Sequence, residues 1–185
     1  MAKWKQKPLG EVTAFMSKGI PPKYMDAESS STIRVLNQKC NRNFMISYTE
    51  SRLHNNAIKP VPREKLLRNG DVLINSTGTG TAGRVAQILK VPMPTTIDGH
   101  MILLRPAKEL DFLYYGYAIK AQQAKIEGLA EGSTGQTEIN RKRLQEEIVI
   151  PYPEDLRVQH NIGYFLMEID DKIELNNAIN NNLAA

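Results

Sequence analysis

The sequence predicts a mixed α/β fold of the α+β kind, with a strand-rich domain over residues 1–153 and one long helix over residues 154–185. Three observations predict this fold class. Short apolar runs alternate with turns rich in Gly, Pro and Asn, which is typical of strands. One internal segment carries a helical repeat behind an Asp that can cap it. The final segment, from Asp155 to Leu183, contains no proline and repeats its apolar positions every three or four residues.

The N-terminal part of the chain begins with an entry segment, Trp4 to Lys18, that mixes apolar and polar positions. The stretch from Gly19 to Ser31 is expected to be a loop, because Pro21-Pro22 blocks helix formation. Residues Thr32 to Leu36 predict a strand, and a polar loop from Asn37 to Asn43 follows it.

The clearest local pattern is a hairpin. Residues Val72 to Asn75 and Arg84 to Leu89 each predict a strand, and the glycine-threonine run between them predicts a turn. The same run, Gly78 to Gly83, also matches the GxGxxG pattern of nucleotide sites. That function needs a helix to begin at the loop, with its N-terminus facing phosphate. Here the following residues alternate as a strand and soon reach Pro92, so the hairpin turn explains the glycines better.

The second half of the domain predicts a strand at Gly99 to Leu104 and a helix that Asp111 caps and that ends near Gly128. Four residues are expected to share one face of this helix: Leu113, Tyr117, Ala121 and Ala124. Further segments follow in order: a polar loop from Glu131 to Thr137, a basic turn from Asn140 to Arg143, and a strand from Ile148 to Ile150.

The long C-terminal helix carries an apolar stripe with the alternating four- and three-residue steps of a coiled coil. The residues on this stripe are Ile162, Leu166, Ile169, Ile173, Asn176, Asn180 and Leu183, and Phe165 and Ile179 widen it. A terminal helix of this length cannot bury such a stripe along its whole length against its own domain, so we expect it to pair with another helix. The two asparagines on the seam would then fix register and partner choice. The alternative is a polar tail that frays, since Asn is a poor helix former.

Charge is unevenly distributed between the two parts. The whole chain has a net charge of +4, but residues 154–185 hold two basic and six acidic side chains. A basic domain joined to an acidic helix suggests a polyanionic partner for the first and a protein partner for the second. Cys40 is the single cysteine, so no internal disulfide forms and a reducing, cytoplasmic location is expected. No apolar run approaches the length of a membrane span, and no Cys/His cluster indicates a metal or cofactor.

Several segments together resemble the specificity (S) subunits of type I restriction-modification systems. Residues 132–183 (GSTGQTEINRKRLQEEIVIPYPEDLRVQHNIGYFLMEIDDKIELNNAINNNL) are similar to the conserved region of that family, with Gln159 and Ile162 matching its helix motif. Arg157-Val158 departs from the acidic residue that usually precedes the glutamine. The segments WKQKPLGEV, GDVLINSTGTGTAGRVA and DGHMILLRP resemble a target-recognition domain of the same family.

The resemblance implies a target-recognition domain that grips one half of a split DNA site, and a conserved helix that sets spacing and recruits methyltransferase (M) subunits and through them the restriction (R) subunit. It also implies that the chain has no catalytic residues and no cofactor of its own. A full family member usually holds two such halves, so this chain is expected to be either a piece of a longer protein or a half-subunit that forms a homodimer through the helix from Asp155 to Leu183.

Three polar loops supply the residue types that contact DNA phosphates and base edges. The candidates in the first loop are Lys18, Lys23, Asn37, Lys39, Arg42 and Asn43. Those in the second are Thr77, Thr79 and Arg84, and those in the third are Thr134, Gln136, Thr137, Arg141 and Arg143. Each residue alone could equally be a solvated side chain, but for the loops as a set the composition and the resemblance agree on DNA.

Two other functional classes remain as alternatives. One is an adaptor that bridges proteins through the long helix without binding DNA. The other is a stand-alone methyltransferase or nuclease. A base-flipping methyltransferase needs an Asn/Asp-Pro-Pro-aromatic loop, whereas Pro21-Pro22 lacks both flanking groups. A nuclease needs clustered carboxylates, and Asp170-Asp171 is expected to be a solvated part of the helix.

Overall fold

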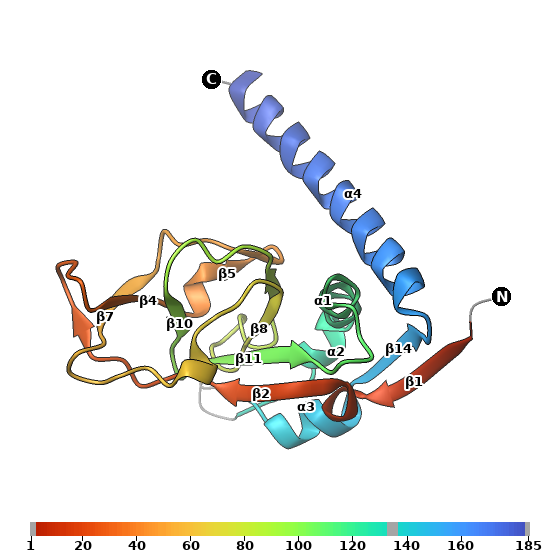
Figure 1. The fold of residues 1–185 in the computed structure, drawn as a ribbon, viewed down its shortest axis with the longest axis horizontal. Helices are drawn as coiled ribbons and strands as arrows, with labels where there is room; N and C mark the ends of the chain where they lie inside the picture. Colours follow the sequence, from red (N-terminus) through yellow and green to blue (C-terminus); the bar gives the residue numbers. More distant parts are fainter. Residues whose placement is uncertain (1–2, 133–136, 184–185) are drawn as a thin grey trace.

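The computed structural model describes residues 3–132 and 137–183 (Figure 1). It confirms the mixed α/β class: two four-stranded sheets and three short helices form the body, and one long helix projects from it. Within the described ranges, no helix is long and apolar enough to cross a membrane.

A fully antiparallel sheet forms the centre of the body. Its order is β2 (Thr13–Lys18), β11 (Met101–Pro106), β8 (Asp71–Asn75) and β9 (Val85–Ile88). The predicted hairpin is confirmed, because Asp71 pairs with Ile88 and Ile74 with Val85. A second sheet has the order β10 (Thr95–Ile97), β4 (Thr32–Leu36), β7 (Arg52–Asn55) and β3 (Tyr24–Met25). Only its β10–β4 pair is parallel.

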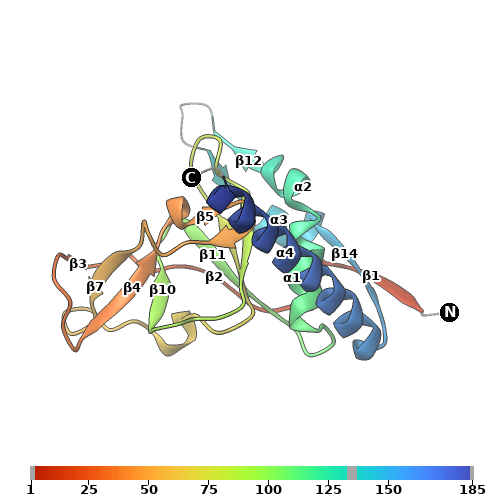
Figure 2. The same ribbon diagram turned by 90° about the horizontal axis from the view of Figure 1, so that it is seen from above.

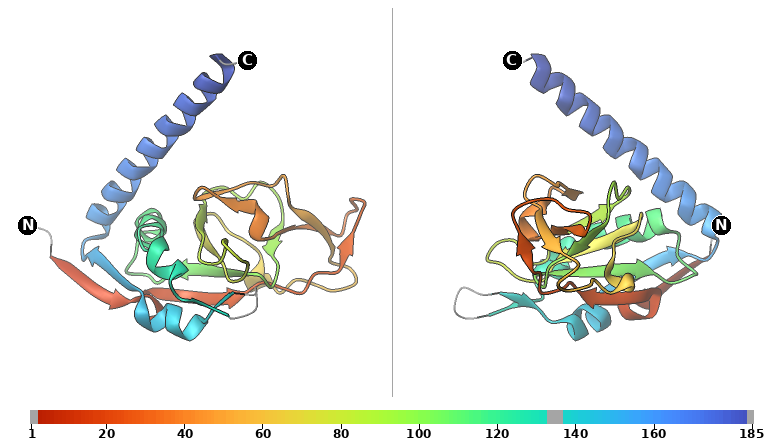
Figure 3. Two further views of the ribbon diagram at one scale, coloured as in Figure 1. Left: turned by 180° about the vertical axis from the view of Figure 1, so that it is seen from behind. Right: turned by 60° about the vertical axis from the view of Figure 1, so that its left-hand side comes forward.

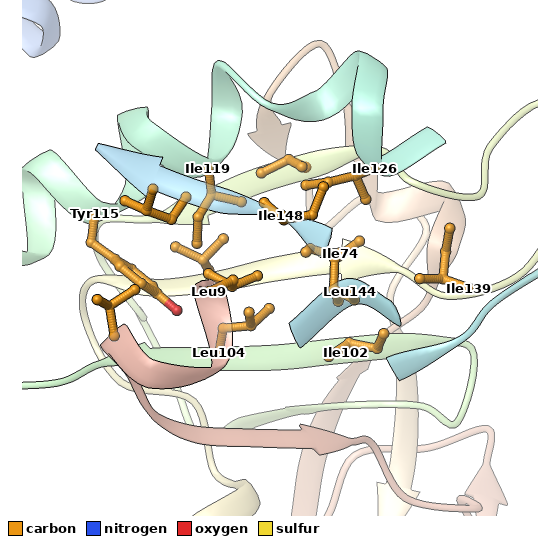
Figure 4. Packing of buried hydrophobic residues seen from close by; sticks show 14 of the residues in the cluster. Leu9, Ile74, Ile102, Leu104, Tyr115, Ile119, Ile126, Ile139, Leu144 and Ile148 are labelled. Atoms are coloured by element: carbon orange, nitrogen blue, oxygen red, sulfur yellow. The ribbon is translucent and has the colours of Figure 1, made fainter. Parts of the chain in front are cut away.

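The central sheet is buried on both faces. Alternate residues of a strand point to opposite sides of the sheet, so its strands supply side chains to two apolar clusters. Ile74 and Ile102 point into the larger apolar cluster (Figure 4). Leu73 and Leu103, one position away on the same two strands, point into a smaller cluster shared with the second sheet. Cys40 belongs to this smaller cluster and is fully buried.

Helices and the chain termini cover the larger cluster. The elements are η1 (Leu9–Val12), α1 (Phe112–Lys120), α2 (Gln123–Glu127), α3 (Arg141–Glu147) and the pair of β1 (Trp4–Pro8) with β14 (Val149–Pro153). Two short hairpins and two 3-10 turns complete the body: β5 (Asn41–Arg42) with β6 (Met45–Ile46), β12 (Ala130–Glu131) with β13 (Glu138–Ile139), η2 (Gln38–Cys40) and η3 (Arg63–Lys65).

Two helical predictions need correction. The helix expected from Asp111 to Gly128 is two helices, and Ala121 and Ala124 are exposed rather than on a buried face. The Asp111 cap is confirmed, since its Oδ1 accepts from Leu113 N at 2.9 Å. The basic turn at Asn140 is the first turn of α3, which Asn140 caps through Lys142 N.

The long helix α4 (Leu156–Leu183) leaves the body at its base, and its C-terminal end points away from both sheets (Figures 1 and 3). The prediction of one continuous helix from Asp155 to Leu183 is therefore confirmed to within one residue.

Candidate nucleic-acid interface

The three predicted loops meet at one end of the strands of the central sheet, where β8 ends. Thr77 lies just after β8, and its Oγ1 contacts Gln38 Oε1 of the first loop at 3.3 Å. Gly78 exchanges hydrogen bonds with Thr137 of the third loop, from Gly78 N to Thr137 O and from Thr137 Oγ1 to Gly78 O. Figure 2 shows the turn between β8 and β9 beside the β12–β13 hairpin. Residues more than 90 positions apart in the sequence thus share one surface.

Glycine is required at two positions of the β8–β9 turn. Gly78 has φ of 113°, and a Cβ there would lie 2.3 Å from Thr81 Oγ1. Gly83 has φ of 89°, and a Cβ would lie 2.6 Å from Glu127 Cα. Only glycine adopts such conformations without strain. Because the turn leads into β9 and not into a helix, it lacks the helix N-terminus that a dinucleotide site requires.

A buried pair of asparagines fixes the first loop to the second. Asn41 Nδ2 donates to Asn75 Oδ1 at 3.3 Å and to Arg84 O at 2.9 Å. Asn75 Nδ2 in turn donates to Gln38 O at 3.1 Å. Both asparagines are fully buried, where such bonds are costly to break. The sequence analysis did not predict this hydrogen-bonded pair. The signal that could have revealed it is Asn75, a polar residue at the end of the apolar strand β8.

Arg42, Asn43 and Arg84 line one open pocket of about 560 Å³ together with Phe44 and Gln123. The tight β5–β6 turn brings Arg42 there, with Asn43 and Phe44 both at positive φ. The Arg84 guanidinium donates to Gly80 O at 3.0 Å, which holds it over the turn. Two of the predicted DNA-contacting arginines therefore face the same space.

A second pocket, of about 380 Å³, lies on the other side of Gln38. Its polar lining includes Asn37, Lys39, Asp98 and His100. Burial raises the pKa of the Asp98 carboxyl, which accepts from His100 N at 2.9 Å. His100, which was not among the predicted DNA-contacting residues, is exposed and contacts Thr77.

Some of the predicted DNA-contacting residues form contacts with other parts of the protein. Lys23 is exposed at the start of the second sheet, where its backbone N donates to His54. The Asn37 side chain caps η2 and also donates to Glu50 O at 2.6 Å, so both its ends are occupied. Lys18 forms an ion pair with Glu138.

The structure describes Thr137, Arg141 and Arg143 of the third loop. Arg143 forms ion pairs with Glu147 and Glu131, so its charge is offset, whereas Arg141 is exposed beside Asn140. Thr79 is exposed at the tip of the β8–β9 turn. Thr134 and Gln136 lie outside the described residues.

The base of the long helix is locked to the body by one glutamine. Gln159 is fully buried; its Nε2 donates to Glu109 O at 2.9 Å and to Pro153 O at 2.7 Å, and its Oε1 accepts from Asp111 N at 2.8 Å. Gly163 allows close approach to α1, since a Cβ there would lie 2.7 Å from Leu113 Cβ.

A third contact lies farther along the helix. Asp170 accepts from Tyr117 OH at 3.0 Å and from Lys120 Nζ at 2.6 Å. This carboxylate also raises the pKa of Tyr117 beyond the effect of burial. Together with Gln159, it fixes the direction in which α4 leaves the body.

Beyond Asp170 the described part of the helix is exposed to solvent. All the described side chains from Asp171 to Asn182 are exposed, including Ile173 at 52% and Ile179 at 46%. Of the predicted stripe, Ile162 and Leu166 are half-buried, while Phe165, Ile169, Ile173, Asn176, Ile179 and Asn180 are exposed. The side chain of Leu183 is not described. The expectation that the body cannot cover the whole stripe is met.

Within the described ranges, no three His, Cys, Asp or Glu side chains are grouped so that they could hold a metal ion. The described part of the chain combines a polar loop surface with a projecting helix that carries an exposed apolar stripe. The chain belongs to the family described as the type I restriction modification DNA specificity domain, whose model matches residues 1–185. The resemblance drawn from the sequence is confirmed.

Three solved structures share this fold. The S subunit of the type I restriction-modification system from M. genitalium has a TM-score of 0.66, 20% sequence identity and coverage of 94% of this chain. A chain from a study of complex assembly and conformational transition of the type I R-M system has a TM-score of 0.63, 20% identity and 93% coverage. The HsdS subunit of Thermoanaerobacter tengcongensis has a TM-score of 0.58, 20% identity and 93% coverage.

This chain spans 40%, 39% and 38% of those three chains, respectively. No curated protein sequence matches it.

Proposed function

We propose that this chain reads one half of a two-part DNA site as the non-catalytic specificity component of a type I restriction-modification system. The observation that carries the proposal is the convergence of three loops, each rich in DNA-contacting residue types, at the end of β8 in a chain of this family. In this proposal residues 1–153 are the target-recognition domain and residues 154–185 are the helix for assembly.

The charges on the loop surface support DNA binding. Lys39, Arg42, Arg84 and Arg141 carry no ion pair within the described part of the chain, so their charges remain available to phosphates. Arginine suits this task because its planar fork can bind phosphate or guanine through two parallel bonds. Contacts from several loops would fix the register of the duplex, while base edges would supply sequence discrimination.

The projecting helix supports a homodimer. In our proposal, residues Phe165 to Leu183 of α4 pair with the same segment of a second copy as an antiparallel coiled coil. A two-fold axis in the protein would match inverted half-sites in the DNA. Such a dimer would present its conserved helices to M subunits, and through them to the R subunit, in the cytoplasm. An adaptor role without DNA binding has no specific observation in its favour.

Salt dependence tests the phosphate contacts directly. We expect binding to a fluorescent duplex of random sequence to weaken steeply with salt, because each neutralised phosphate releases counterions. Replacing Arg84 with alanine should reduce the slope of log K against log salt by about 1, as should Arg42→Ala. Fluorescence anisotropy at several salt concentrations measures both slopes.

The matched control is Lys5→Ala, which removes a cation that is paired with Glu154 and lies on β1, a strand that pairs with β14 and contributes no residue to the three loops. Its slope should equal that of the unaltered protein. Equal losses of slope in all three variants would contradict the assignment of this surface, and absence of any binding would contradict DNA recognition itself.

A further inference from the structure

A hydrogen-bonded chain of three side chains crosses the loop surface. Thr77 Oγ1 lies 2.8 Å from His100 Nδ1 and 3.3 Å from Gln38 Oε1. The three residues come from three different segments: η2, the turn after β8 and the turn before β11. Gln38 and His100 line the same open pocket, so both ends of the chain face one space.

The single proton of the Thr77 hydroxyl determines what the two ends present. If Thr77 donates to Gln38 Oε1, it must accept from His100 Nδ1–H. In a neutral imidazole this leaves His100 Nε2 as an acceptor, and it leaves the Gln38 amide N–H groups as donors. The two hydrogen bonds can also run in the opposite direction, with the Gln38 amide group rotated by 180°. Gln38 then presents its oxygen as an acceptor, and His100 presents its Nε2–H as a donor. Either sense leaves one donor and one acceptor.

One base has the complementary pair on its major-groove edge. Adenine offers the N7 acceptor beside the N6 donor, whereas guanine offers two acceptors. Thymine offers an acceptor and a methyl group, and cytosine offers a donor. A site whose donor and acceptor both contact a single base therefore matches adenine, whereas in a G·C pair the acceptor and the donor lie on two different bases.

The site is held in place before any ligand arrives. Asn75 Nδ2 holds the backbone of Gln38, and Asp98 Oδ1 holds the backbone N of His100. A Cβ on Gly78 would lie 3.0 Å from Gln38 Oε1, so the turn packs closely on the glutamine. Side chains that are already ordered lose little conformational freedom on binding.

The charges around the pocket are balanced. Glu50 and Asp98 line it, and so do Lys39 and Arg52. The Arg52 guanidinium stacks over the Tyr24 ring at 3.4 Å, while Lys39 is exposed at the rim. Lys39 is therefore placed to contact a phosphate next to the base.

We propose that Gln38 and His100, joined through Thr77, read one adenine of the half-site in the major groove. The inference rests on the proposed function, since it concerns the same loop surface.

Selection from a pool of duplexes with a randomised segment tests the inference, using the full chain as the selecting protein. We expect the unaltered protein to enrich adenine strongly at one position. Thr77→Val keeps the shape of the side chain but removes the link, and should reduce the preference for adenine at that position by about 10- to 100-fold. Preferences at the other positions should remain. Thr77→Ser keeps the hydroxyl and is the matched control, expected to retain the adenine.

A modified base and a second variant separate reading from folding. In the selected duplex, 7-deazaadenine at that position lacks the N7 acceptor and should weaken binding by the unaltered protein but not by Thr77→Val. His100→Phe alters an exposed ring and should lose the same preference as Thr77→Val.

The outcomes distinguish the two claims. If the unaltered protein binds no duplex or enriches no sequence, the proposed function fails, and this inference fails with it. If it enriches a sequence but Thr77→Val and His100→Phe leave every base preference unchanged, only the reading by Gln38 and His100 is overturned.

Discussion

Replacing Ile173 and Ile179 with aspartate is expected to convert the proposed dimer to a monomer. Both side chains project from the part of α4 that the body does not cover. Burial of an isoleucine side chain contributes about 1.5–3 kcal/mol. Each copy would lose two such side chains from the interface and would gain two negative charges there. Since about 1.4 kcal/mol is a tenfold change in affinity, the double variant should dimerise at least about 100-fold more weakly. Light scattering over a concentration series measures the mass.

The chain offers a matched control on the same stretch of helix. Leu175 and Ala178 lie off the predicted seam, so Leu175→Asp with Ala178→Asp adds the same charge without touching the interface. This variant should keep the mass of the unaltered protein. A protein that is monomeric before any substitution, or equal weakening by both double variants, would contradict pairing through the seam.

Replacing Arg105 with alanine is expected to destabilise the fold by about 3–5 kcal/mol, the usual result of breaking a buried ion pair from one side. Arg105 donates to both Asp71 oxygens, at 2.8 and 3.0 Å, and to the carbonyls of Glu64 and Leu66, each at 2.7 Å. The side chains of Arg105 and Asp71 are only 11% and 3% exposed, respectively. The variant would leave a buried carboxylate without its cation. Urea unfolding followed by circular dichroism measures the loss.

Two further variants show whether the buried pair is the cause. Arg34→Ala breaks an ion pair with Glu28 that is far more exposed, and should change stability by about 0–1 kcal/mol. Arg105→Lys keeps the charge but loses the planar fork, so an intermediate loss is expected. If Arg105→Ala is no more destabilising than Arg34→Ala, the buried Asp71–Arg105 ion pair does not stabilise the fold as predicted.

Local patterns predicted only part of the strands, since β2 of the central sheet and β7 and β10 of the second sheet were not predicted. The strand from Thr32 to Leu36 was predicted with its observed limits, and the hairpin around the glycine-threonine turn has the predicted pairing. These elements depend on short-range rules: alternation across a sheet and glycine at positive φ. The Asp111 cap and the uninterrupted C-terminal helix follow from equally local rules.

Tertiary contacts explain where helix prediction failed. The helix after Asp111 breaks near Ala121, and Gln123 at the start of α2 accepts from Val85 N at 2.8 Å, a contact with an edge strand that no local pattern reveals. The start of α3 could have been found. Asn140 is a good N-cap, and Leu144 and Ile148 follow at helical spacing, but the basic cluster suggested a turn instead.

The sequence predicted which residue types form the candidate site, but it did not predict how the loops that carry them are arranged in space. Composition identified the loops, yet their meeting at Thr77 and Gly78 depends on strand order, which the sequence does not specify. The engagement of Asn37 as a cap and of Arg143 in ion pairs also depends on neighbours brought by the fold. The buried hydrogen bond between Asn41 and Asn75 was not predicted for the same reason.

Hydrogen–deuterium exchange of the full chain, with and without a saturating DNA duplex, tests most directly whether the body grips DNA and the helix does not. We expect DNA to slow exchange in residues 37–43, 76–84 and 137–143, and to leave residues 171–182 of α4 unchanged at a protein concentration where the dimer is complete. Protection confined to α4, with all three loops exchanging as before, would contradict this division of roles.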